Sequence, residues 1–239
     1  MVVSVPFSVQ PDLLRSERAL GTVVGPNSLR AAAKREAFLG RFGPDYLGQL
    51  HTAKEGLALL SAELRLPEGS LESLALAVEE DLAILHHGVL IAIAFAFPSG
   101  FVPTKKLGLD FAGMHLPVAD GEALRAASSG ITSAIKRPGA RYERGVWTVT
   151  ALPSMSQHPL IERPEPTSLD ELFFRTERQV LVGLGQGWTG FSVKVEMTQW
   201  DELTATQQQR ISESIRSMSP AMLSYKGLHS VAALMSNFH

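Results

Sequence analysis

The stretch Val89-Leu-Ile-Ala-Ile-Ala-Phe-Ala96 is a short apolar run rich in branched residues, and the turn Phe97-Pro-Ser-Gly100 follows it directly. A run of this length that ends at proline and glycine favours a buried strand over a helix. A second turn, over Pro103–Gly108, contains two lysines. We therefore expect a central strand at 89–96 that leads into a lysine-bearing loop.

Three zones are visible along the 239 residues. Residues 1–87 are predicted to be helical, residues 88–200 to be a strand-rich core, and residues 201–239 to be a helical tail. No linker or repeat separates these zones, and the length suits one domain. The prediction is a single α+β domain over residues 1–239, in which helices flank an antiparallel sheet.

The helices are predicted from apolar spacing and from capping residues. Asn27 or Ser28 caps the first helix, which runs to Gly40. The third helix starts near Ser70 and extends to the pair His86-His87 in its last turn, where we expect a structural role. The stripe that predicts this third helix is Leu71, Leu74, Val78, Leu82 and Leu85. Further helices are expected at 45–63, 121–135 and 201–218, with a short one after Pro220.

Besides 89–96, strands are expected at 146–152, 178–184 and 188–197. The last two form a predicted hairpin around the glycines at 183, 185, 187 and 190. These glycines do not form a dinucleotide-binding fingerprint, because they lie between two strands and open no helix.

The composition excludes several classes of protein. The chain has no cysteine, which excludes disulfides, zinc–thiolate sites, iron–sulfur clusters and cysteine nucleophiles. A formal net charge of −2 gives no reason to expect a nucleic-acid partner. No apolar run approaches the ~20 residues that cross a bilayer. The first ten residues lack the features of a signal peptide, so we expect no membrane partner and a cytoplasmic location.

His115 lies in the segment Met114-His-Leu-Pro-Val118. We expect extended backbone here, because residues before proline favour it. A histidine on a stiff segment can present one ring nitrogen to a metal, and its other nitrogen then needs an acceptor that fixes the tautomer. The alternative is a core histidine bonded to a backbone carbonyl. The spacing alone leaves both interpretations open.

A second distinctive cluster is Arg175-Thr-Glu-Arg178-Gln179. If a strand begins by Thr176, Thr176 and Arg178 share one face, and Glu177 and Gln179 share the other. An arginine here could clamp a carboxylate, or it could form a structural pair with glutamate at a sheet edge. Ser99 is expected to be a turn residue or a hydrogen-bond donor to a ligand.

Taken together, five short motifs resemble the haem-dependent oxidative N-demethylase family in their order and approximate spacing. The resemblance extends from about residue 42 to residue 228. The motifs are Glu80-Asp-Leu82, Phe97-Pro-Ser-Gly-Phe101, the pair Lys106-x-Gly108 and Met114–Val118, Arg175–Gln179, and Tyr225-Lys-Gly227.

The resemblance implies a PAS-like sheet with haem b in its cleft and His115 as the axial ligand. Because there is no cysteine, the haem would be non-covalent. Lys106 and Arg178, with Arg175, would pair with the propionates or with an acidic group of the substrate. The residues Ser99, Phe101 and Gln179 complete the expected cofactor site, and Tyr142 and Glu196 are candidates for the catalytic distal side.

The implied function is monooxygenation of an amine or a related small molecule, with O2 and a separate reductase. The competing interpretation is a non-catalytic PAS-like sensor of haem or of a small ligand. The chain also departs from the family pattern. Ala221 stands where an acidic residue is usual, so we expect a larger amine than dimethylamine as the substrate.

Overall fold

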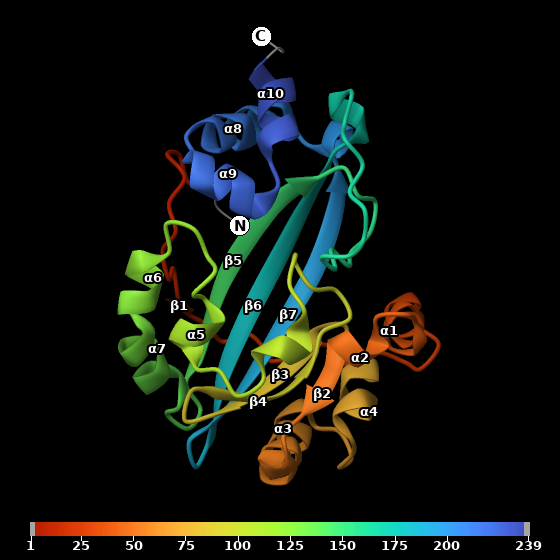
Figure 1. The fold of residues 1–239 in the computed structure, drawn as a ribbon. Coiled ribbons are helices and arrows are strands. Elements are labelled where there is room, and N and C mark those ends of the chain that lie inside the picture. The colour runs from red at the N-terminus through yellow and green to blue at the C-terminus, as the bar shows by residue number, and fades with distance from the viewer. Residues whose placement is uncertain (1–2, 237–239) are drawn as a thin grey trace.

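The computed structural model describes residues 3–236, and in this part of the chain a seven-stranded antiparallel sheet carries the fold (Figure 1). The strand order is β1-β5-β6-β7-β3-β4-β2. The strands are β1 (Leu14–Arg15), β2 (Leu47–Gln49), β3 (Asp81–His86), β4 (Val89–Ala94), β5 (Arg141–Thr150), β6 (Phe173–Gly185) and β7 (Trp188–Gln199).

Helices lie at both ends of the sheet and along one side of it (Figure 1). At one end are α1 (Leu29–Leu39), α2 (Gly43–Tyr46), α3 (Lys54–Leu64) and α4 (Leu71–Leu76). Beside β5 are α5 (Phe111–Met114), α6 (Glu122–Ala126) and α7 (Ser128–Ile135), and at the far end are α8 (Ala205–Arg216), α9 (Pro220–Lys226) and α10 (His229–Ser236). Short 3-10 turns occur at His51–Ala53, Pro103–Lys106, Leu169–Glu171 and Trp200–Glu202. Among residues 3–236, every helix falls short of the length or the hydropathy needed to cross a bilayer.

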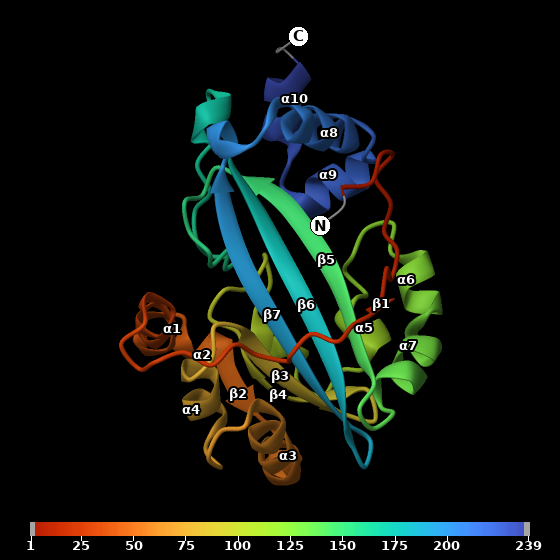
Figure 2. The same cartoon turned by 180° about the vertical axis from the view of Figure 1, so that it is seen from behind.

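The segment between β1 and α1 runs across the back of the sheet (Figure 2). On this face α3 packs closely against the sheet at Gly56, where a Cβ would lie 2.5 Å from the ring of Trp188. Only a glycine permits that approach, and Trp188 is fully buried as a result. Leu20 of the N-terminal segment belongs to the same core cluster.

The hairpin predicted from the glycine pattern is confirmed. Its strands β6 and β7 pair from Phe173↔Gln199 to Gly185↔Trp188. The turn needs positive φ angles, and Gly185 (95°), Gln186 (52°) and Gly187 (83°) supply them. The expected α+β class and the helix capped by Ser28 are also confirmed, since Ser28 Oγ accepts from the Ala31 N–H at 3.1 Å.

Two predictions about the first zone are wrong. The third helix ends at Leu76, and Asp81–His86 form the strand β3. This strand is buried on both faces, so its apolar residues continue the helical spacing without any alternation. The helix expected at 45–63 is interrupted by β2, which pairs with β4. In the middle zone, the helix expected at 121–135 is divided into α6 and α7.

A buried ion pair joins α1 to the start of β3. Lys34 is 0% exposed, and its ammonium donates to the carbonyls of Ala75, Val78 and Glu80. Its Nζ lies 3.9 Å from Asp81 Oδ1. Burial lowers the pKa of Lys34 to about 8, although the negative charge of Asp81 raises it. This pair fixes the end of the sheet from which the strand β4 leads towards the Phe97–Phe101 loop.

We predict that Lys34→Met destabilises the protein by about 3–5 kcal/mol, because it leaves Asp81 as an uncompensated buried charge. Urea unfolding followed by circular dichroism measures this change. The matched control is Lys54→Met, at the exposed first residue of α3, where we expect little change. Equal stabilities of the two variants would contradict the structural role of the pair.

Candidate functional site

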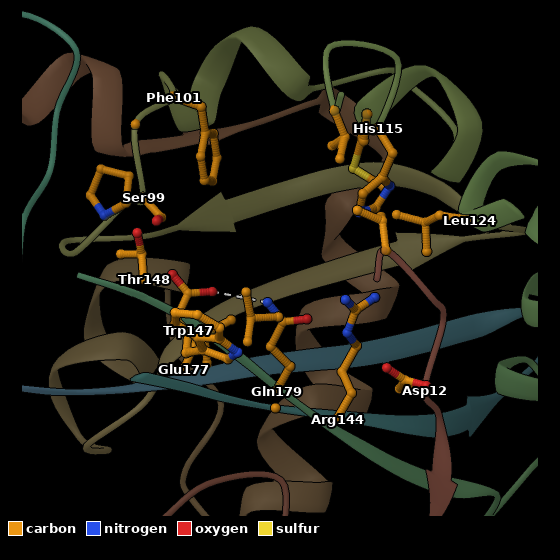
Figure 3. A pocket seen from close by; sticks show the side chains of 18 of the residues that line it. Asp12, Ser99, Phe101, His115, Leu124, Arg144, Trp147, Thr148, Glu177 and Gln179 are labelled. Atoms are coloured by element: carbon orange, nitrogen blue, oxygen red, sulfur yellow. Dashed lines mark hydrogen bonds between the residues drawn. The ribbon is translucent and has the colours of Figure 1, made fainter. Parts of the chain in front are cut away.

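A cavity of about 540 Å³ lies between the sheet and the segments that cover its front face. This volume is within the range of small-molecule and cofactor sites. Its cover comes from the loop after Phe97, from α5 to α7, from N-terminal residues 4–13 and from α9. Figure 3 shows the side chains that point into it. The apolar part of the wall includes Leu85, Leu90, Ile93, Phe95, Phe97, Leu124, Ile131 and Phe191.

The register of β5, β6 and β7 decides which side chains face this cavity. Arg144 pairs with Gln179, and Gln179 pairs with Val193, so these three residues share one face. Moving two residues along β6 places Glu177 on the same face. The neighbouring positions, among them Arg178, point to the opposite face of the sheet.

His115 enters the cavity from the C-terminal end of α5. Its Nδ1 lies 2.7 Å from the Phe111 carbonyl oxygen, so Nδ1–H donates and Nε2 keeps its lone pair. Burial lowers the pKa of His115, and the nearby charges of Arg144 and Lys106 act in the same direction. The imidazole is therefore neutral at pH 7, in the tautomer that leaves Nε2 available to a metal ion.

The backbone at His115 differs from the expected extended form. Its φ and ψ are −100° and 6°, and Asp110 Oδ1 caps the helix before it by accepting from the Gly113 N–H at 2.8 Å. The restriction imposed by Pro117 acts on Leu116, the residue directly before it, and does not reach His115. The helical turn is also what brings Phe111 O under the imidazole, four residues away.

Lys106 supports the same segment. Its ammonium donates to the Met114 carbonyl at 2.9 Å, next to His115. Lys106 also lines the cavity, and burial lowers its pKa. An ammonium has three donors, so two remain for a ligand.

Arg175 and Glu177 form a buried pair, and Glu177 is part of the cavity wall. Arg175 is 1% exposed, and its Nη1 lies 2.5 Å from Glu177 Oε1. Gln179 Nε2 donates to the other carboxylate oxygen at 3.0 Å, shown as a dashed line in Figure 3. Arg175 also donates to the carbonyls of Met155 and Phe97. The pair anticipated at a sheet edge thus exists, but in the central strand β6.

The structure brings five of the expected site residues to the cavity: Ser99, Phe101, Lys106, His115 and Gln179. It does not bring Arg178 or Glu196 there. Both lie on the opposite face of the sheet, where Glu196 is exposed and Lys194 Nζ is 3.5 Å from its carboxylate. Tyr142 packs beside the cavity against Leu181 and its neighbours. Because side chains alternate along a strand, Arg178 and Glu196 point away from the cavity.

Two cavity residues, Arg144 and Lys226, have no assigned role in the sequence interpretation. Arg144 precedes the predicted strand 146–152, but β5 already begins at Arg141. Extending the alternation backwards from Val146 would have placed Arg144 on the cavity face. Lys226 belongs to the Tyr-Lys-Gly motif, which is too short to show a helical or strand pattern and so does not predict which way its side chain points. Ala221 is exposed on α9 and does not line the cavity.

Comparison with protein families identifies the relationship. Residues 47–235, well over half of the chain, match the family described as haem-dependent oxidative N-demethylase, alpha subunit-like. The chain belongs to this family. A search of curated proteins finds no match. The family's description gives haem dependence and oxidative chemistry, and the resemblance carried by the five motifs is confirmed.

We predict that the imidazole of His115 carries its proton on Nδ1 and titrates below the ordinary pKa of about 6.5. Burial favours the neutral ring, so the charged form should appear only at lower pH. Two-dimensional 1H–15N correlation of the histidine rings in the haem-free protein measures both properties. A proton on Nε2, or a midpoint at or above the ordinary value, would contradict the geometry at Phe111.

Proposed function

We propose that this protein is a haem b-dependent monooxygenase of an amine or a related small molecule, with His115 as the axial ligand of the iron. The observation that carries the proposal is the neutral His115 ring, whose Nδ1–H is held by Phe111 O while Nε2 is free beside the cavity. Histidine ligands of metals commonly donate their second N–H to a carbonyl in this way.

The remaining cavity suits a porphyrin. A haem presents two apolar faces, four of its own nitrogen ligands and two carboxylates, so it needs one protein ligand, apolar walls and cations. Residues 3–236 contain no cluster of three or more metal-binding carboxylate or imidazole side chains, and a haem requires none. The aromatic and aliphatic wall supplies the apolar contacts. Lys106 and Arg163 line the cavity and provide positive charges that can pair with the propionates.

When bound, haem would supply activation of O2 and one-electron redox chemistry. The chain would contribute orientation and exclusion of water. The hydrogen bond to Phe111 O raises the basicity of His115 and fixes its ring. Apolar side chains such as Phe95 and Phe191 exclude water from the reacting group. Because Gln179 donates its amide N–H to Glu177, its carbonyl oxygen is left to accept a hydrogen bond from a substrate N–H.

The reductant must come from elsewhere. The glycines at 183, 185 and 187 belong to the β6–β7 hairpin, so they form no nucleotide-binding turn. We propose that a separate reductase delivers the electrons and that the protein acts in the cytoplasm. Oxidation of an N-alkyl amine by O2, two electrons and two protons would release an aldehyde, the dealkylated amine and one molecule of water.

We predict that His115→Ala purifies folded but retains little haem. The substitution removes the imidazole, which is the one protein ligand of the iron that we propose. The haem content per chain, from the pyridine haemochromogen spectrum, measures the effect. The control is His229→Ala, at an exposed histidine of α10 that contacts Ser224. Haem content equal to that of the wild type in His115→Ala would refute the ligand assignment.

Activity is a second, separate prediction. With an external flavoprotein reductase and NADPH, the wild type should release aldehyde from N-methyl amines larger than dimethylamine, and His115→Ala should release none. Aldehyde is measured by a colorimetric assay, with catalase present. Inertness across the whole panel, combined with reversible binding of CO by the haem protein, would favour the non-catalytic sensor instead.

A further inference from the structure

Two cations of the cavity lack an acidic partner. Arg144 points from β5 into the cavity, towards the wall that carries His115 (Figure 3). Its Nε is buried and finds no acceptor within residues 3–236. Over the same residues, the ion pairs include neither Arg144 nor Lys226. A buried N–H without an acceptor costs free energy unless a ligand supplies one.

Lys226, the last residue of α9, lies near the same charges. Its ammonium donates to the Trp147 carbonyl at 2.8 Å and lies over the rings of Phe7 and Trp147, at 5.4 and 5.7 Å from their centroids. One backbone acceptor leaves two of its three N–H groups unused. Burial lowers the pKa of Lys226 to about 8; Glu177 opposes this, and the charges of Arg175 and Arg144 add to it.

Among the described residues, the carboxylates nearby form no ion pair with either cation. Glu177 is already bound by Arg175 on one oxygen and by Gln179 on the other. Asp12 acts on Arg144 only through its charge and is itself exposed. Two like charges that face one cavity repel each other, so an anion that contacts both relieves the repulsion and supplies the missing acceptors.

We propose that Arg144 and Lys226 bind the two oxygens of one carboxylate group. A guanidinium and an ammonium both supply charged N–H donors, which carboxylate oxygens accept strongly. The group has two potential sources: an acidic substrate, or a propionate of the haem. Arg144 has a buried Nε and Arg163 is exposed, whereas propionates occupy the mouth of a haem pocket.

The buried Nε of Arg144 favours the substrate as the source. The substrate class is then an amine that also bears a carboxylate, such as an N-alkylated amino acid. This assignment rests on the proposed oxidation of an amine, whereas the carboxylate site itself does not.

The test uses calorimetric titration of the full-length protein, without haem and with haem, by N,N-dimethylglycine and by its uncharged amide. The wild type should bind the acid at least tenfold more tightly than the amide, and Arg144→Gln or Lys226→Gln should remove roughly that factor. Arg144→Lys keeps the positive charge but loses the planar guanidinium, so it should retain part of the selectivity that Arg144→Gln loses. The matched control is Arg178→Gln, which removes one charge from the opposite face of the same sheet. Circular dichroism checks that each variant is folded.

A second arm follows the transfer of haem from each reconstituted variant to apomyoglobin. Loss of acid selectivity with unchanged haem transfer supports the site and identifies the substrate as the source. Faster haem transfer in both variants but not in the control supports the site and identifies a propionate. If neither acid selectivity nor haem transfer changes, the carboxylate site is refuted. Because the haem-free titration needs no haem, failure of haem binding would refute the proposed function separately.

Discussion

Buried charges hold both the N–H and the carbonyl of Phe97, and the shape of the site depends on this residue. Asp81 accepts the Phe97 N–H at 2.9 Å, and Arg175 donates to the Phe97 carbonyl at 2.8 Å. Asp81 is compensated by Lys34, and Arg175 by Glu177. Charged groups of this kind are costly to bury unless their partners are in place, so the four side chains define one position for the end of β4.

From this point the chain enters the loop that carries Ser99 and Phe101, and then the turn that leads to Lys106 and α5. The same charges explain the electrostatics of the cavity. Because Glu177 is hydrogen-bonded to Arg175 and Gln179, the buried Nε of Arg144 is left without an acceptor among the described residues. The Arg175–Glu177 pair therefore makes the cavity receptive to anions.

Much of the architecture could be predicted from the sequence. The hairpin β6–β7 was predictable because glycines interrupt two alternating strands, and α1 because Ser28 is a good cap. The strand β3 was not, since a strand buried on both faces has no alternation and merges with the helical pattern before it. For that reason the predicted third helix extends over Asp81, although this residue begins β3 and is buried beside Lys34.

The site was predictable in part, for physical reasons that differ from residue to residue. His115 and its need for a second acceptor followed from residue chemistry, but the acceptor itself, Phe111 O, depends on a helical turn that the nearby proline appeared to exclude. Arg178 was chosen for its charge, while the face on which it lies is fixed by the register with β5 and β7. Arg144 and Lys226 come together only through packing of segments about eighty residues apart.

The central claim is that the cavity beside His115 holds one haem. Titration of the purified, haem-free protein with hemin, followed by its absorption between 350 and 700 nm, tests this claim most directly. The account predicts a sharp Soret band that differs from that of free hemin and saturates at one equivalent per chain. A spectrum that remains the sum of protein and free hemin at every ratio would contradict it.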